Sequence, residues 1–305
     1  MEKHRKKLIK NAAVFDGHSS GLAQGKKIVI EDDIVTEITA GEVSEENFDE
    51  VFDGTGMVAM PGMTDAHVHM GCLFAKGEFP VDYATVLTVA KCKDALMAGF
   101  TTFRDAGSVS EGLKLAFDEG VLPGPRIYPC GAYISQTCGH GDSEYAHTYR
   151  DIQYRHPSST VLADGVPEII RAVREQFYRG ASHIKLMATE ILNRHEDIRL
   201  LFGTDMMITG PDYQVEQSED IRYYEKRFGT MRALRALTGT ANEVFALTTY
   251  QNPYPKGKIG VLEAGSYADL LLVDGDPTKR VSVLADTDHL RLIMKGGTVY
   301  KNTLC

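Results

Sequence analysis

The stretch HIKLMATEILNRHEDIRLLFGTDMM, residues 183–207, contains two strand-like runs, HIKLMAT and IRLLFGTD. Each run carries one charged side chain among mostly apolar neighbours, Lys185 in the first run and Asp205 in the second. A strand buried in a parallel sheet is normally apolar on both faces, and an unpaired charge is costly to bury. The two side chains therefore either reach solvent at the ends of their strands or serve a function.

The region around this stretch, from about residue 62 to residue 248, alternates strand-like and helix-like segments. Such repeated βα units indicate a parallel sheet with helices outside it. A closed barrel of this kind needs eight strands, and the pattern provides five. The predicted strands are residues 63–69, 101–107, 126–135, 182–189 and 198–205, and the predicted helices are residues 83–100, 111–120, 167–180 and a last helical region over 222–247.

The two ends of the chain have a different pattern from the centre. Short strands separated by glycine and acidic turns fill residues 7–60, and similar strands return near the C-terminus, where a Gly-Gly pair favours a hairpin turn. Chain termini usually lie close together at the surface of a domain. We therefore predict one composite β-domain from residues 1–61 and 249–305, and a (β/α) barrel-like catalytic domain over residues 62–248.

Composition and charge exclude several classes of protein. The 305-residue chain is 43% hydrophobic and 25% charged, and it contains no run of 18 apolar residues that could span a membrane. Its net charge of −9 argues against nucleic acid and anionic membranes as partners. Five cysteines form no CxxC pair, and the basic N-terminus lacks the apolar stretch of a signal peptide. A cytoplasmic location is expected.

Two histidines stand at the end of the first predicted central strand, in TDAHVH. His67 and His69 are two residues apart, so a strand points both side chains toward the same face. Ligands gather at the carboxyl ends of strands in α/β folds, and two imidazoles on one face can hold one metal ion. The alternative is that they are unrelated polar residues at a strand terminus.

Lys185 and Asp205 extend this candidate site. A lysine amine can take up CO2 to form a carbamate that bridges two metal ions; the alternative is a lysine paired with a neighbouring acid. The Asp205 carboxylate could bind a metal ion and accept a proton from water. It could also cap a turn or a helix, because GTD is typical of turns.

Four segments of the chain resemble the amidohydrolase superfamily, in particular its branch of imidazolonepropionase-related and Xaa-Pro-dipeptidase-like enzymes. These segments are MVAMPGMTDAHVHM, HIKLMAT, LLFGTDMM and GKIGVLEAGSYADLLLVDGDP. The resemblance implies a TIM barrel with a β-sandwich built from both termini. It also implies one or two divalent metal ions, usually zinc, that activate water against an amide or lactam carbonyl.

Each candidate residue has a place in the pattern of this family. His67 and His69 match the ligands on the first strand, and Lys185 matches the carboxylated bridging lysine. Asp205 matches the aspartate of the last strand, which is both a metal ligand and the general base. The CGHGD segment resembles a loop that approaches the substrate, which makes His140 a candidate substrate-binding residue; the alternative is a solvated loop histidine.

The chain departs from the family pattern between Lys185 and Asp205. Twenty positions separate them, where the family has three further βα units, two of which each supply a histidine ligand. The expected fold class is therefore α/β, with an incomplete TIM-barrel-like metal-dependent hydrolase domain plus a small β-sandwich formed by both termini. His195, the histidine inside this gap, is expected to be a solvated residue rather than a ligand.

The remaining residues could still form a metal site. His67, His69 and Asp205 provide three ligands, as in catalytic zinc sites that keep an open position. We expect one weakly held divalent ion, most simply zinc, with Lys185 uncarboxylated; two ions are the alternative. The hypothesis requires the two imidazoles and the carboxylate to converge within about 8 Å.

The sequence leaves three interpretations of function open. The first is a metal-dependent amidohydrolase, in which activated water attacks an amide- or lactam-type C–N bond of a small dipeptide, N-acyl amino acid or cyclic amide. The second is a catalytically impaired metal-binding or regulatory protein that retains the amidohydrolase scaffold. The third is a shortened chain that needs a partner to complete the barrel. Because an open sheet edge promotes association, a homo-oligomer is expected.

Overall fold

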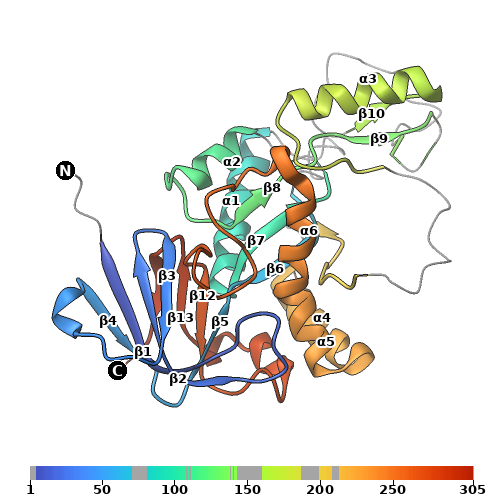
Figure 1. The fold of residues 1–305 in the computed structure, drawn as a ribbon. Coiled ribbons are helices and arrows are strands. Elements are labelled where there is room, and N and C mark those ends of the chain that lie inside the picture. The colour runs from blue at the N-terminus through green and yellow to red at the C-terminus, as the bar shows by residue number, and fades with distance from the viewer. Residues whose placement is uncertain are drawn as a thin grey trace.

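The structure is a computed structural model of the 305-residue chain. It describes residues 5–70, 81–107, 109, 111–137, 139, 141–142, 160–186, 199–207 and 213–304. This part of the chain is mixed α/β, with a sheet made from both ends of the chain beside a group of central strands and helices (Figure 1).

Both ends of the chain contribute to one sheet of eight strands, here called the terminal sheet (Figure 1). Its order is β14-β13-β12-β5-β1-β2-β3, and β4 also pairs with β1. The central strand β5 pairs in parallel with β1 and antiparallel with β12, so segments from opposite ends of the sequence lie side by side. The strands are β1 (Lys6–Val14), β2 (Ala23–Glu31), β3 (Ile34–Thr39), β4 (Glu50–Asp53), β5 (Val58–Pro61), β12 (Leu270–Val273), β13 (Leu290–Lys295) and β14 (Thr298–Asn302).

The middle of the terminal sheet is buried on both faces, as strand β12 shows. Leu270 and Leu272 lie in one hydrophobic core, whereas Leu271 and Val273 lie in another. This alternation is the period of two that a strand imposes on its side chains. The core that contains Leu270 and Leu272 also receives side chains from β3 and β13, two strands near opposite edges of the sheet. The core that contains Leu271 and Val273 is shared with the central helices.

The central part contains parallel strands alternating with helices (Figure 1). One sheet has the order β11-β6-β7-β8, and β9 pairs in parallel with β10. The described residues form no closed barrel. The strands are β6 (Met63–His69), β7 (Phe100–Asp105), β8 (Arg126–Tyr128), β9 (Tyr133–Ser135), β10 (Thr160–Leu162) and β11 (Met206–Met207). The α-helices are α1 (Val81–Met97), α2 (Glu111–Asp118), α3 (Gly165–Tyr178), α4 (Tyr213–Phe228), α5 (Thr230–Leu237) and α6 (Gly239–Phe245). The 3-10 helices, found in both parts of the chain, are η1 (Glu45–Asn47), η3 (Ala246–Gln251), η4 (Val281–Ala285) and η5 (Thr287–His289).

Most predicted elements are confirmed within a few residues at their ends. The first two predicted central strands correspond to β6 and β7, and the helices α1, α2 and α3 occupy their predicted segments. The predicted hairpin joins β13 and β14 at Gly296 and Gly297, whose φ angles of 54° and 70° favour glycine. No helix in the described ranges is both long and apolar enough to cross a membrane.

The prediction of one strand over residues 126–135 is wrong. This segment forms two short strands, β8 and β9, which belong to different sheets. Pro129 between them has no backbone donor for a ladder. Gly131 has a φ of 69°, and the amide of Ala132 donates to Gln176 Oε1 at 2.9 Å. The chain therefore leaves the first sheet before it begins the second.

Within the described residues, neither strand predicted in the opening stretch forms a regular strand over its predicted range. Of residues 182–189, the described part contributes a single bridge between Leu186 and Ile134. Residues 199–205 are irregular, and the regular ladder with β6 begins at Met206. The connecting residues 187–198, which include His195, lie outside the described residues.

Lys295, at the end of β13, is expected to make stability depend on pH. Its ammonium is buried and donates to the Gly124 carbonyl at 2.6 Å. Burial lowers the pKa of Lys295 to about 8, from an ordinary value of 10.5. Because the folded pKa lies below the unfolded one, the charged lysine destabilises the fold below pH 8, and this cost disappears as the pH rises to 10.5.

Chemical denaturation of the Lys295→Met variant at several pH values tests this expectation. Between pH 8 and 10.5, the free energy of unfolding of the unmodified protein should rise relative to the variant by up to about 3 kcal/mol. The exposed Lys279 provides a matched Lys→Met control at the surface. Parallel pH curves for the unmodified protein and Lys295→Met would contradict the expectation.

Candidate metal and catalytic site

Three side chains with metal-binding atoms meet at the end of β6. The Nε2 atoms of His67 and His69 lie 3.0 and 3.1 Å from Asp205 Oδ1. The ligand atoms of all three residues lie within 4.8 Å of one another. Although 136 positions separate His69 from Asp205 in the sequence, the fold brings them together at one point.

Backbone pairing along β6 places the aspartate beside the histidines. The amide of Ala66 donates to the Phe202 carbonyl at 2.8 Å, and the amide of Asp205 donates to the His67 carbonyl at 2.7 Å. The approach depends on Gly203, because a Cβ there would lie 2.7 Å from His67 Cβ. A side chain at this position would push the Asp205 segment away from β6.

Asp205 has an unusual backbone for a residue with a side chain. Its φ of 55° lies in the left-handed region, which aspartate and asparagine tolerate better than most residues. Its carboxylate is 72% exposed. Residues held in such conformations are found often at functional sites, and here the backbone turn leaves the carboxylate accessible while it contacts both imidazoles.

The surroundings of the His67 imidazole favour its neutral form. Burial, followed by the nearby charge of Lys185, lowers the pKa of His67 to about 4, although Asp205 opposes the shift. The Nζ atom of Lys185 lies 3.0 Å from His67 Nε2. A neutral imidazole is the form that binds a metal ion. The Lys185 amine therefore lies directly against the histidine–aspartate cluster.

A buried carboxylate contacts the two segments that carry the cluster. Asp65 is fully buried and accepts hydrogen bonds from the backbone of His67, from the backbone and hydroxyl of Thr204, and from the Gln217 side chain. Burial raises the pKa of Asp65 to about 6, against these hydrogen bonds, which lower it. The sequence reasoning did not single out Asp65, although the acid two residues before His67 was a visible signal.

Two further basic residues near the cluster were also not predicted. The guanidinium of Arg104 on β7 donates to the Ala66 carbonyl at 3.4 Å. His183 contacts the Ser182 hydroxyl through Nδ1 at 3.0 Å, and burial followed by Arg104 lowers its pKa to about 3. His183 shares its predicted strand face with Lys185, and that two-residue spacing could have indicated it.

The structure brings together three of the five predicted site residues and places a fourth beside them. His67, His69 and Asp205 form the cluster, and Lys185 contacts His67. His140 lies outside the described residues. The roles of ligand, general base and substrate contact remain predictions for all of them.

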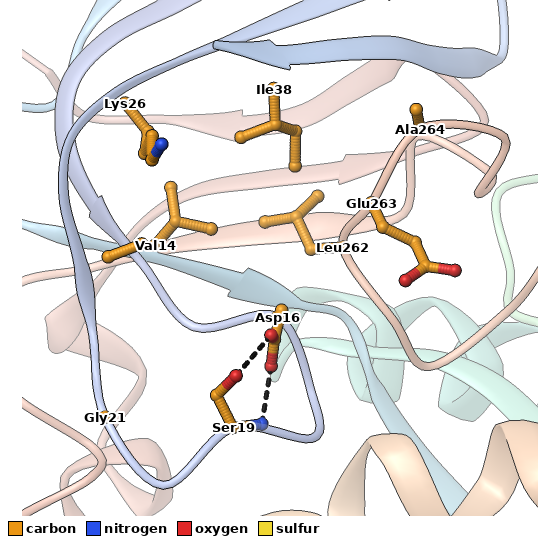
Figure 2. Close-up of a pocket in the computed structure, with 10 residues that line it drawn as sticks. Val14, Asp16, Ser19, Gly21, Lys26, Ile38, Leu262, Glu263 and Ala264 are labelled. Carbon is orange, nitrogen blue, oxygen red and sulfur yellow. Dashed lines mark hydrogen bonds between the residues drawn. The ribbon is translucent and has the colours of Figure 1, made fainter. Parts of the chain in front are cut away.

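A separate cavity of about 320 Å³ lies against the terminal sheet (Figure 2). None of its lining residues belongs to the histidine–aspartate cluster. The Asp16 carboxylate at its rim accepts from the hydroxyl of Ser19 at 2.5 Å and from its backbone at 2.7 Å, so it caps a turn (Figure 2).

Comparisons with known proteins point to the same region of the chain. Residues 58–198, which carry both histidines and Lys185, match the amidohydrolase family. Ochratoxinase from Aspergillus niger is 34% identical over 152 residues, covering 43% of this chain and 31% of that protein. Imidazolonepropionase from Picrophilus torridus is 39% identical over 176 residues, covering 53% of this chain and 43% of that protein. The chain thus spans less than half the length of these curated relatives.

A solved structure shares the fold over nearly the whole chain. A prolidase complexed with N-methylphosphonate-L-proline has a TM-score of 0.83 at 22% identity, covering 97% of this chain and 100% of that one. At such identity the likeness shows the fold alone. Together with the family match, this likeness indicates that the central strands and helices follow the amidohydrolase fold, although some of the strands are irregular. The resemblance of this chain to the amidohydrolase superfamily, with imidazolonepropionase and prolidase among the proteins it resembles, is confirmed.

Proposed function

We propose that this protein is a metal-dependent hydrolase of amide- or lactam-type C–N bonds. The observation that carries the proposal is the convergence of two imidazole nitrogens and one carboxylate oxygen within 4.8 Å. The similarity to imidazolonepropionase and to the prolidase structure supports chemistry on small amides. A dipeptide, an N-acyl amino acid or a cyclic amide is the substrate class.

The donor atoms fit a single divalent cation such as zinc. Two imidazoles and one carboxylate are a common ligand set for catalytic zinc, which keeps a further position open. The exposure of Asp205 provides that access from solvent. We infer that His67, His69 and Asp205 hold one ion and that Lys185 stays an uncarboxylated amine, since its Nζ already contacts His67.

Each residue of the candidate site has its own role in the proposed hydrolysis. A bound divalent ion supplies Lewis acidity that polarises the carbonyl and makes an attacking water more acidic. His67 and His69 fix the position of the ion. Asp205 accepts the proton that the water releases as its oxygen attacks the carbonyl carbon, and then delivers a proton to the departing nitrogen. His140 is proposed to contact the substrate.

The domain plan also belongs to this proposal. We take residues 1–61 with 249–305 as a β-sandwich domain and residues 62–248 as an incomplete barrel that carries the site. The single core that side chains from β3 and β13 share supports the sandwich. A homo-oligomer that covers the open strand edges, and a cytoplasmic location, complete the proposal.

Metal removal and reconstitution test the proposed function. The full chain is dialysed against a chelator, reloaded with zinc, and assayed on Xaa-Pro dipeptides, N-acetyl amino acids and a cyclic amide. We expect about one zinc per chain by elemental analysis and hydrolysis that disappears with the metal. Two ions per chain would instead contradict the single-ion site.

The same experiment separates the other interpretations. Stoichiometric metal binding without turnover on any amide would favour a regulatory or impaired protein. Metal binding and turnover that depend on chain concentration, with a matching change in a sizing column, would favour a site completed by association. Absence of metal binding at all would overturn the proposal.

A further inference from the structure

The Asp65 carboxylate joins three elements that surround the candidate metal site. Its Oδ1 accepts from the His67 amide on β6 and from the Thr204 amide, both at 3.2 Å. Its Oδ2 accepts from the Thr204 hydroxyl at 2.9 Å and from Gln217 Nε2 on α4 at 3.2 Å. Donors from β6, from the segment before β11 and from α4 thus meet on one buried side chain.

These contacts lie immediately next to the residues that would hold the metal. Asp65 precedes His67 by two residues on β6, and its Oδ1 accepts from the His67 amide. Thr204 directly precedes Asp205, whose backbone adopts the left-handed conformation. Such a conformation persists only where the surroundings fix it, and the two hydrogen bonds from Thr204 to Asp65 fix the residue that leads into it.

Regular strand pairing does not hold this part of the Asp205 segment. Residues 199–205 are irregular, and the parallel ladder with β6 begins at Met206. The amide of Asp205 still bonds to the His67 carbonyl, which sets its distance from β6. The carboxylate of Asp65 adds the contacts that set the direction in which the chain enters Asp205.

We propose that Asp65 is a positioning residue, which through Thr204 and Gln217 holds the Asp205 carboxylate against the imidazoles of His67 and His69. This inference rests on the proposed metal-dependent function of the same site. Asp65 contacts neither substrate nor metal in this proposal, and acts through the two segments that it joins. Partners that orient metal ligands typically change metal affinity by about 10- to 100-fold when they are replaced.

The test compares Asp65→Asn and Thr204→Val with the unmodified full chain. Thr204→Val removes the shortest of these hydrogen bonds, at 2.9 Å, but keeps the buried carboxylate, so it separates geometry from electrostatics. Cobalt or zinc affinity of the metal-free proteins is measured by competition with a chromogenic chelator, and the absorption spectrum of the bound cobalt is recorded. We expect about 10-fold or greater weakening in both variants, with an altered cobalt spectrum and a lowered kcat at little-changed KM.

Thr64→Val is the matched control. Thr64 is fully buried on the same strand, and within the described part of the chain its hydroxyl has no hydrogen-bond partner. The metal affinity and the cobalt spectrum of the Thr64→Val variant should equal those of the unmodified protein. This comparison removes the general effect of a Thr→Val change in the strand.

Three outcomes are distinguishable. Unchanged affinity and spectrum in both variants, with a lowered melting temperature, would assign Asp65 a purely structural role and overturn the inference. If Asp65→Asn does not fold, Thr204→Val alone decides between these results. If the unmodified protein binds neither cobalt nor zinc, the proposed function itself fails, independently of how the variants behave.

Discussion

Replacing Asp205 by asparagine is expected to reduce amide hydrolysis by about 10³-fold. The carboxylate oxygen that meets both imidazoles would become part of an amide, which cannot accept the proton of the attacking water. Asparagine tolerates the left-handed backbone of this position, so the fold should persist. Steady-state kinetics on the best amide substrate, together with circular dichroism of the metal-free variant, measures both effects.

Asp32 provides a closely matched control. It is also an aspartate in the left-handed conformation, with a φ of 54°, but it lies in the terminal sheet between β2 and β3. Asp32→Asn should leave kcat and KM unchanged. Activity of Asp205→Asn within threefold of the unmodified protein would exclude Asp205 as the general base.

Replacing Asp269 by alanine is expected to lower the free energy of unfolding by about 3–5 kcal/mol. Asp269, just before β12, accepts from Arg126 on β8 at 2.7 and 3.2 Å and from the amide of Gly296 at 2.6 Å. Burial would lower the pKa of Arg126, but Asp269 more than offsets it and raises that pKa. Without the carboxylate, a buried guanidinium would remain without its partner and the terminal sheet would lose a contact with β8.

Urea denaturation followed by circular dichroism measures this loss. The exposed pair of Arg199 and Glu243 is the control, because surface ion pairs contribute about 0–1 kcal/mol. Glu243→Ala should therefore change stability little. The double replacement of Asp269 and Arg126 by leucine should recover part of the loss, since no charge is then buried alone. A loss below about 1 kcal/mol for Asp269→Ala would contradict the expectation.

Local sequence patterns predicted the regular elements well. The alternation in MTDAHVH and the helical segments that follow it correspond to β6, α1 and α2. Prediction failed where neighbours in space decide the structure. Residues 126–135 contain enough apolar side chains for one strand, yet Pro129 and the contact of Ala132 with Gln176 divide it. The segment leading to Asp205 is likewise shaped by Asp65 and Gly203 rather than by its own strand propensity.

The sequence by itself determined the residue types of the site: two histidines on one face of a strand, a lysine and an aspartate in apolar runs, and motifs typical of amidohydrolases. Only the tertiary structure decided that His67, His69 and Asp205 meet within 4.8 Å and that Lys185 contacts His67. It also decided that Asp65 lies buried and contacts the two segments that carry the cluster. The reason is physical: periodicity and propensity act over a few residues, whereas the distance between side chains 136 positions apart depends on how β6 and the Asp205 segment pair and pack.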